Sequence, residues 1–146
     1  MQLDEKAWQL LQALQADGRA PLKSLAAAAG LSIPATAERL RRLQEAGVIR
    51  GIHAELDAQA LGYGVRAIIG ITAAQPAKPQ LLATLAELPQ VLECQHVTGA
   101  DSYVLNVVAP DLAGLEALIA RISLFGETRT SIVLSSPIPR RGLRPA

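Results

Sequence analysis

The sequence predicts an α+β protein in which an N-terminal helical unit is followed by a unit that mixes strands and helices. Apolar residues recur at helical spacing up to about residue 47, and short runs rich in Ile and Val begin at residue 65. The segment between them, residues 57–64, has two glycines and no clear period, which is typical of a linker. With 146 residues, 50% of them hydrophobic, the chain can form one domain or two small ones.

The first two predicted helices follow from apolar spacing and from their stop signals. Leucine and alanine residues at helical spacing predict a first helix over residues 3–16, and Gly18 is suited to end it. Residues 22–29 are rich in alanine and leucine, both strong helix formers, and Gly30 closes this second helix. Both helices are therefore expected to be short, with a brief loop between them.

A third helix and an alternating segment complete the predicted N-terminal unit. Ser32 can cap this helix by accepting backbone N–H bonds, Pro34 is tolerated in its first turn, and Gly47 ends it. Two helices joined by a short turn that contains Gly30 have the sequence form of a helix-turn-helix, which reads DNA. The alternation in residues 48–56 predicts a short strand or hairpin, so we expect a winged helix-turn-helix.

The third helix is predicted to place one side against the other helices and the opposite side against DNA. On a wheel of about 100° per residue, its packed side contains Ile33, Ala37 and Leu40. Small residues and arginines on the other side suit a DNA groove, because they permit close approach and reach guanine edges or phosphates. The residues that we expect to contact DNA are Ser32, Ala35, Thr36, Arg39, Arg42 and Arg50. The alternative is a solvated charged surface in which Glu38 and Arg42 form an i,i+4 ion pair.

The bulk charge of the chain does not favour a nucleic-acid partner. The chain has 14 basic and 13 acidic residues and a net charge of +1, and residues 1–55 hold seven basic and six acidic residues. This balance is compatible with an ordinary soluble protein that binds no nucleic acid. Only the local cluster of arginines in the third helix, together with the turn and the cap, indicates DNA binding.

The C-terminal half predicts the order β-α-β-β-α-β, which is the split βαβ or ferredoxin-like arrangement. Strands are expected over residues 65–73, 91–98, 103–109 and 128–135, and helices over 80–88 and from the N-cap Asp111 to 124. The predicted domains are therefore 1–56, the linker 57–64, 65–136 and a basic, proline-rich tail over 137–146. We expect this tail to be solvated and poorly ordered.

The predicted strands are apolar on both sides. In the first strand, Ile69 and Ile71 lie on one side and Ile68 on the other. A sheet without a polar side requires a partner, so self-association is expected. The alternative is that the N-terminal helices of the same chain cover the second side of the sheet.

The loop between the second and third strands is a second candidate site. Gly99 permits a turn, and Asp101 and Ser102 offer oxygens beside backbone N–H groups, as the ammonium and carboxylate of an amino acid would require. The alternative is a simple hairpin turn, which residue chemistry alone favours. The residues that we expect to contact a small-molecule effector are Gly99, Ala100, Asp101, Ser102 and Tyr103.

Several classes of protein are not supported by the sequence. Cys94 and His96 offer only two neighbouring ligands, so Cys94 is expected to be packed and we predict no metal site. No nucleophile with a base, phosphate-binding glycine loop or carboxylate pair is legible, so we predict neither an enzyme nor a cofactor. The single cysteine fits a reducing cytoplasm, and no signal peptide or membrane span is expected.

A series of spaced motifs runs through nearly the whole chain. In the N-terminal half they are Leu3-Asp4, Leu10-Leu11, Gly18-Arg19, Leu25-Ala26, Gly30-Leu31-Ser32, Arg39, Leu43 and Gly47-Val48-Ile49. Further along they are Leu61-Gly62, Pro89, Val91, Val97-Thr98-Gly99 and Ser102-Tyr103. In these motifs the chain resembles the leucine-responsive regulator/AsnC (Lrp/AsnC) family of bacterial and archaeal transcription regulators. It departs from the family at Ala7, which replaces a second acid, and at Ser102, which replaces an Asp now found one place earlier as Asp101.

The resemblance implies a sequence-specific regulator of double-stranded DNA, with amino acids as common effectors. It also implies a homodimer formed through the C-terminal sheets and often assembled into an octamer. We expect a small ligand near residues 99–103, at a subunit interface, to change the assembly or the spacing of the DNA-binding domains. The alternative is a small-molecule-binding, allosteric module without DNA binding, which would show no salt-dependent DNA affinity.

Overall fold

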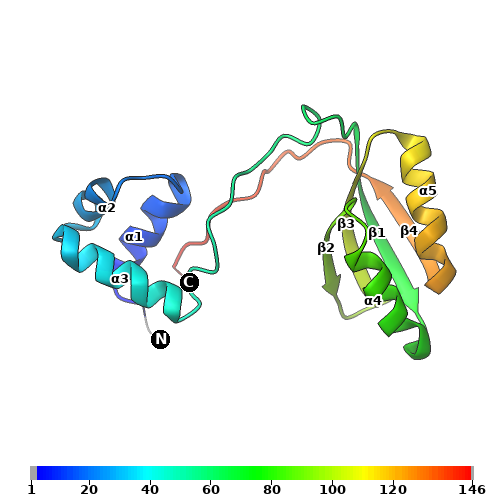
Figure 1. Cartoon of the computed structure of the whole chain (residues 1–146), viewed down its shortest axis with the longest axis horizontal. Helices are drawn as coiled ribbons and strands as arrows, with labels where there is room; N and C mark the ends of the chain where they lie inside the picture. The colour runs from blue at the N-terminus through cyan, green and yellow to red at the C-terminus, as the bar shows by residue number, and fades with distance from the viewer. Residues whose placement is uncertain (1–2, 146) are drawn as a thin grey trace. The chain divides into compact units, whose positions relative to one another are not determined.

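The computed structural model describes residues 3–145 of the chain, which divide into two compact units. One unit consists of Met1–Glu55 together with Ile138–Ala146, and the other consists of Leu56–Pro137 (Figure 1). The chain therefore leaves the N-terminal unit, builds the second unit and returns to the first. Each unit has its own hydrophobic core.

Three helices build the N-terminal unit: α1 (Glu5–Ala16), α2 (Leu22–Ala29) and α3 (Ile33–Glu45). The three predicted helices are confirmed. Helix α1 starts slightly later than expected because Asp4 caps it, with Oδ1 accepting from the backbone N–H of Ala7 at 2.8 Å. Ser32 caps α3 as expected, because its Oγ accepts from a backbone N–H at 3.3 Å.

The turn between α2 and α3 depends on Gly30. This residue has left-handed backbone angles, with φ of 59° and ψ of 46°, and its N–H donates to the last turn of α2. The N–H of Leu31 also turns back, to the carbonyl of Ala26 at 2.9 Å. These bonds end α2 and turn the chain at once into the N-cap of α3, as the sequence predicts.

Helix α1 packs against both helices of the turn. Leu10 is fully buried and lies in one cluster with Leu25 and Ala29 of α2. Leu11 joins a second cluster with Leu43 of α3. Apolar contacts between α1 and the packed side of α3 thus fix the orientation of α3.

The strand that was expected over residues 48–56 is not formed, so that prediction is wrong. Among residues 3–145, the segment pairs with no other strand. A strand needs a hydrogen-bonded neighbour, which alternation along one segment does not supply. Ile52 lies instead against Gly18, whose missing Cβ leaves room for it.

The C-terminal tail is exposed, as expected, but it contacts α1. The side-chain amide of Gln15 donates to the carbonyl of Leu143 at 3.1 Å and accepts from the N–H of Leu143 at 2.7 Å. One side-chain amide thus satisfies both polar groups of a single residue of the tail. The contact gives Leu143 a defined partner, and the poor order of the tail stays a prediction.

The second unit begins with a short turn and continues as one sheet with two helices. Asp57 caps the turn by accepting from the N–H of Gln59 at 2.9 Å. The elements that follow are β1 (Val65–Ala73), α4 (Lys78–Ala86), β2 (Val91–His96), β3 (Tyr103–Ala109), α5 (Leu112–Ile122) and β4 (Gly126–Ile132). The predicted β-α-β-β-α-β order is confirmed, and the four antiparallel strands lie in the order β2-β3-β1-β4.

Both helices of this unit pack on the same side of the sheet. Ile69 and Ile71 of β1 and Leu105 of β3 are fully buried there, together with Leu81 of α4 and Ile122 of α5. Burial of each such side chain stabilises the fold by roughly 1.5–3 kcal/mol relative to exposure. This side of the sheet is the main core of the second unit.

The open side of the sheet is more polar than predicted. Ile68 of β1 is 41% exposed there, opposite Asn106 of β3, and Val104 lies on the same side two residues along β3. Alternation along the outer strands places polar side chains around them: Glu93, Gln95, Glu127, Arg129 and Ser131. The prediction erred because β4 begins at Gly126 and ends at Ile132, and therefore contains polar residues in place of the apolar run 132–134.

Candidate nucleic-acid interface and ligand loop

The side of α3 that packs inward includes Leu40, as predicted, but it is centred on Thr36 and Leu43, which were expected only to flank it. Thr36 is fully buried, and its hydroxyl donates to the carbonyl of Ser32 at 2.9 Å. Leu43, two turns later, is buried beside α1, and Leu40 packs against the cluster around Leu10. Thr36 therefore lies on the packed side of α3, and its burial contradicts its assignment as a residue that contacts DNA.

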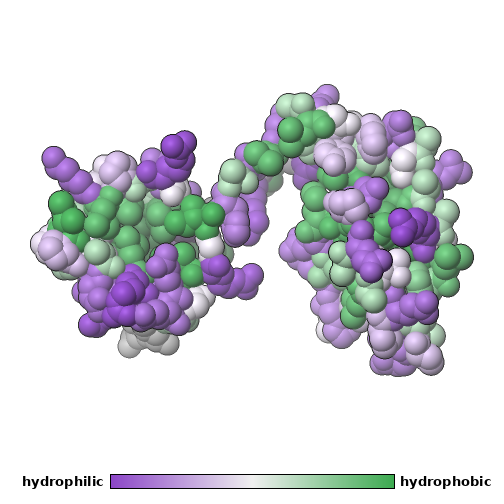
Figure 2. Space-filling model, in the orientation of Figure 1, coloured by the Kyte–Doolittle hydropathy of each residue, from purple (hydrophilic) through white to green (hydrophobic). Residues whose placement is uncertain are grey.

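The outward side of α3 is rotated relative to the prediction. Ile33 is 47% exposed, and Ala37 is exposed as well, although both were expected to pack. Ala35 and Arg39, which were expected to point outward, are half-buried on the side nearest α1. The exposed side consists of Ile33, Pro34, Ala37, Arg41, Arg42, Gln44 and Glu45. Hydrophilic side chains gather over α3 in the space-filling view (Figure 2).

Arg39 is bound to the N-terminal end of α1. Its Nη1 donates to Oδ1 and Oδ2 of Asp4 at 2.8 and 2.7 Å. This bond, followed by the backbone N–H of Ala7, holds the pKa of Asp4 below its ordinary value. The contact ties α3 to the cap of α1, so Arg39 positions the helix in the free protein.

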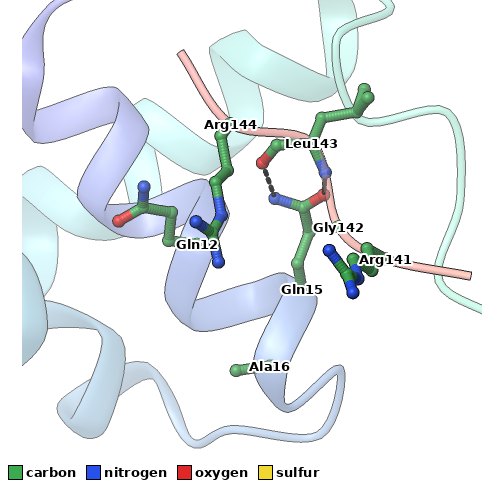
Figure 3. A pocket seen from close by; sticks show the side chains of 7 residues that line it. All are labelled: Gln12, Gln15, Ala16, Arg141, Gly142, Leu143 and Arg144. Atoms are coloured by element: carbon green, nitrogen blue, oxygen red, sulfur yellow. Dashed lines mark hydrogen bonds between the residues drawn. The ribbon is translucent and has the colours of Figure 1, made fainter. Parts of the chain in front are cut away.

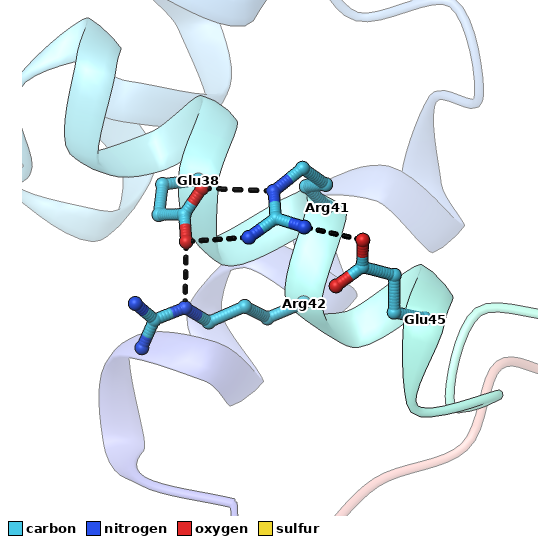
Figure 4. Close-up of polar contacts among 4 residues, drawn as sticks. All are labelled: Glu38, Arg41, Arg42 and Glu45. Atoms are coloured by element: carbon cyan, nitrogen blue, oxygen red, sulfur yellow. Dashed lines mark hydrogen bonds and ion pairs between the residues drawn. The ribbon is translucent and has the colours of Figure 1, made fainter.

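Arg41 and Arg42 share one carboxylate on the surface of α3 (Figure 4). Glu38 accepts from Nε of Arg41 at 2.9 Å and from Nε of Arg42 at 2.7 Å, and Arg41 also pairs with Glu45. The two arginines lower the pKa of Glu38 to about 2. Because these groups are exposed, such pairs stabilise little and can exchange partners with phosphate oxygens.

Arg41 is a functional candidate that the sequence pattern did not reveal. Its place in the sequence, directly before Arg42, gave no reason to prefer it, because the rotation of the predicted helical wheel was wrong. The burial of Thr36 and Leu43 fixes the rotation and turns Arg41 outward. Of the remaining predicted DNA contacts, Ser32 is exposed at the start of α3 and Arg50 is exposed beyond its end.

The predicted ligand loop is folded against the C-terminal end of β1. The N–H of Ser102 donates to the carbonyl of Ile71 at 2.8 Å, and its Oγ accepts from the N–H of Ala73 at 3.2 Å. The hydroxyl of Thr72 donates to the carbonyl of Ala100 at 3.0 Å. Gly99, with φ of 111°, lies exposed at the tip, in a conformation that favours glycine.

Asp101 is directed back over the sheet. Its Oδ1 accepts from Nη2 of Arg129 on β4 at 2.6 Å, and the carboxylate raises the pKa of that guanidinium. A Cβ on Gly70 would lie 2.5 Å from the Asp101 carboxylate, so this glycine of β1 makes room for the side chain. Asp101 of the loop and Arg129 of β4 therefore lie together, with side chains that are 25% and 57% exposed.

Tyr103 does not belong to the exposed part of this loop. It is 7% exposed, lies in the main core and has its ring centroid 5.1 Å from that of His96. Its assignment as an effector contact is corrected, because β3 begins at this residue and alternation turns it toward the helices. Gly99, Ala100 and Asp101 remain the accessible part of the predicted set.

The described part of the chain contains no cluster of metal ligands and no membrane-spanning helix. Cys94 is exposed on β2, not packed as expected, and residues 3–145 contain no group of three or more His, Cys, Asp or Glu suited to a metal ion. Within the same residues, none of the helices combines the length and apolar character that crossing a bilayer requires.

Comparisons with known proteins match both units. Residues 3–50 match the family model described as winged helix-turn-helix DNA-binding. Residues 66–143 match the model described as the Lrp/AsnC ligand binding domain. The two matches cover the helix-turn-helix and the sheet-containing unit from residue 66 onward.

Curated relatives share most of their length with this chain. The HTH-type transcriptional regulator LrpA of Mycobacterium tuberculosis is 38% identical over 130 residues, which are 87% of each protein. The HTH-type transcriptional regulator FL11 of Pyrococcus horikoshii is 32% identical over 137 residues, 92% of this chain and 91% of that protein. These relatives are transcriptional regulators, a class of proteins that are generally not enzymes.

Solved structures share the fold. The feast or famine regulatory protein of M. tuberculosis, complexed with L-methionine, has a TM-score of 0.91 at 37% identity and covers 99% of this chain and 100% of its own. A transcriptional regulator of Neisseria meningitidis in complex with L-methionine has a TM-score of 0.91 at 26% identity, with coverage of 98% and 97%. By its two matching domains and these relatives, the chain is a DNA-binding member of the Lrp/AsnC family of transcription regulators.

Proposed function

We propose that α3 is the recognition helix and that its outward side, Ile33 to Arg42, enters the major groove. The observation that supports this proposal is the burial of Thr36 and Leu43, which leaves Pro34 and Ala37 exposed on one side of α3 and two arginines one turn after Ala37. Small side chains let the backbone approach the bases, and Arg41 and Arg42 then reach guanine edges or phosphates. Ser32 and Arg50 lie at the two ends of this surface and contact phosphates.

In the absence of DNA, the arginines of the proposed surface are held in place by ion pairs with Glu38. Arg41 and Arg42 are held on one carboxylate in the free protein. DNA replaces that carboxylate with phosphate oxygens, so the arginines exchange one charge-assisted partner for another. Arg39 keeps its bond to Asp4 and holds α3 in position.

The assignment is tested with a duplex that the full-length protein selects from a random library. Arg41→Ala and Arg42→Ala are each expected to weaken binding to that duplex roughly tenfold, in line with about 1–3 kcal/mol for a good base contact. Arg121→Ala, at the exposed end of α5, is the matched control and leaves affinity unchanged. Wild-type affinity in both α3 variants would exclude this side of the helix.

The competing function is a small-molecule-binding module without DNA binding. It predicts that no duplex is preferred over another and that affinity for DNA does not depend on salt. The regulator predicts a preferred duplex whose affinity falls as salt rises, because phosphate contacts release counterions. Fluorescence anisotropy at several salt concentrations, with selected and scrambled duplexes, separates the two.

We propose that the effector is an amino acid that binds at the loop formed by Gly99, Ala100 and Asp101. Two structural relatives are complexed with L-methionine. In this chain the loop presents a carboxylate for an ammonium group and a neighbouring guanidinium for a carboxylate, since Asp101 and Arg129 lie together. A thermal-shift screen of the twenty amino acids, including L-methionine, tests the proposal, because a ligand of the folded state raises the melting temperature.

The regulatory step that we propose is a change in assembly. A homodimer formed through the open side of the sheet, or an octamer built from it, brings several DNA-binding units to one operator in the cytoplasm. Joint binding raises the effective concentration of each unit and compensates for weak individual contacts. The effector acts by binding one arrangement of the subunits more tightly than the other.

A further inference from the structure

The charges of the chain are distributed unevenly between the two units. The N-terminal unit, Met1–Glu55 with Ile138–Ala146, contains ten Lys or Arg residues and six acids, a balance of +4. The second unit, Leu56–Pro137, contains four Lys or Arg residues and seven acids, a balance of −3. Residues 1–55 alone have seven basic and six acidic residues, so the tail supplies most of the net positive charge of the N-terminal unit.

The tail owes this charge to Arg140, Arg141 and Arg144, and the tail is fixed to α1 through its backbone. Gln15 pairs with the N–H and carbonyl of Leu143, between the arginines (Figure 3). The side chains of Arg141 and Arg144 lie beside the C-terminal half of α1 in this view. The tail is thus anchored without using any guanidinium group.

The tail also runs beside the segment that follows α3. Arg140 and Leu143 line one cleft together with Ile49, Arg50 and His53. This segment was predicted to form the wing, but it contributes no strand within residues 3–145. The tail therefore brings its arginines to the chain that leaves the recognition helix.

The arginines of the tail differ from those of α3 in their partners. Arg39, Arg41 and Arg42 are each paired with a carboxylate. None of the ion pairs found among residues 3–145 includes an arginine of the tail, and all three are exposed. Unpaired, exposed guanidinium groups beside a DNA-binding unit are suited to phosphate oxygens.

We propose that the tail, residues 138–145, is a second DNA-contacting element that binds the phosphate backbone next to the site read by α3. The inference rests on the proposed DNA-binding function of the N-terminal unit. Basic extensions of other DNA-binding domains follow a groove in this way. Phosphate contacts add affinity and salt dependence without adding sequence preference.

The test is the salt dependence of DNA binding by the full-length protein. Arg141→Gln/Arg144→Gln removes two charges but keeps the backbone groups that bind Gln15. The slope of log affinity against log salt is expected to become shallower by about 0.9 for each phosphate that the variant no longer neutralises, or about 2 for each chain bound. Lys78→Gln/Arg121→Gln removes the same charge from the second unit and is expected to keep the wild-type slope.

Two further measurements make the outcome unambiguous. Arg141→Lys/Arg144→Lys is expected to restore the slope, because lysine also binds phosphate, and circular dichroism shows whether each variant is folded. A wild-type slope in the folded glutamine variant, or a shallow slope that lysine does not restore, would overturn the proposal. If the proposed sequence-specific DNA binding is wrong, the wild-type protein shows no preference between selected and scrambled duplexes. The salt slope can be measured on either duplex, so the two failures are distinguishable.

Discussion

Thr36 shows how a single side chain decides which side of α3 faces outward. A threonine inside a helix can satisfy its hydroxyl on the carbonyl of residue i−4, and Thr36 does so on Ser32. Its polar group is then compatible with full burial, although hydropathy alone places it at the surface. Ala35 and Ala37, on either side, differ too little in chemistry to indicate which of them packs.

A pair of adjacent lysine substitutions tests this rotation. Thr36→Lys places a charge in a fully buried position and is expected to destabilise the protein by about 3 kcal/mol or more. Ala37→Lys places the same charge on the exposed side and is expected to change stability by less than about 0.5 kcal/mol. Urea denaturation of both variants measures the difference, and the opposite order would show that the wheel first predicted from the sequence is correct.

Glu38 is expected to make the stability of the protein depend on pH. Its pKa in the folded protein is about 2, against an ordinary value of 4.5, because Arg41 and Arg42 stabilise the ionised form. A lowered pKa means that this stabilisation is full above pH 4.5 and is lost as the pH falls toward 2. The melting temperature of Glu38→Gln is therefore expected to lie below that of the wild type at pH 7 and to meet it near pH 2. A constant difference over this range would show that the ion pairs do not cause it.

Elements were predicted well wherever local chemistry marks their ends. Ser32 and Asp111 cap helices as expected, each accepting from a backbone N–H, and β1 and β3 have the predicted bounds. The strand expected over residues 48–56 was not predicted correctly, because strand formation depends on a partner that this segment does not encode. The end of β4 was missed for the same reason, since its bounds follow from pairing with β1.

The turn that joins α2 to α3 provides a prediction at this scale. Gly30 has φ of 59°, and a Cβ there would lie 3.1 Å from Nζ of Lys6. Gly30→Ala is expected to destabilise the protein by about 1–2 kcal/mol, because left-handed backbone is costly for alanine. Gly30→Asn is expected to cost less, since asparagine tolerates this conformation better. Thermal unfolding that ranks alanine as the milder change would exclude backbone strain as the cause.

At the scale of the whole chain, the candidate site was only partly legible from the sequence. The helix-turn-helix and the Gly99 loop were located from turn and cap residues, which act over short distances. The sequence did not indicate that the tail arginines lie beside the DNA-binding unit. That position follows from the hydrogen bonds between Gln15 and Leu143, which join distant parts of the sequence. The polar side chains of β2 and β4 on the open side of the sheet were likewise not located from the sequence, because their place depends on the strand order, in which these two strands form the edges.

Ile68 of β1 and Val104 of β3 are apolar, lie diagonally across the two central strands on the open side of the sheet, and give the last prediction. In a two-fold symmetric homodimer built on that side, residues near the axis face their own copies. Ile68→Arg would then place like charges opposite each other and is expected to weaken dimerisation by roughly a hundredfold, since such contacts cost several kcal/mol. Analytical ultracentrifugation measures the shift from dimer to monomer.

A control substitution at Leu124, together with a check that the variant chains remain folded, makes this prediction specific. Ile68 is 41% exposed within one chain, so arginine at this position is compatible with the fold, and circular dichroism is expected to be unchanged. Leu124→Arg places the same charge on another exposed apolar residue, 82% exposed after α5, and is expected to leave the dimer intact. If both variants or neither variant become monomeric, the open side of the sheet is not the interface. If only Ile68→Arg does, the same experiment shows whether loss of the dimer also lowers DNA affinity, as joint binding by two units requires.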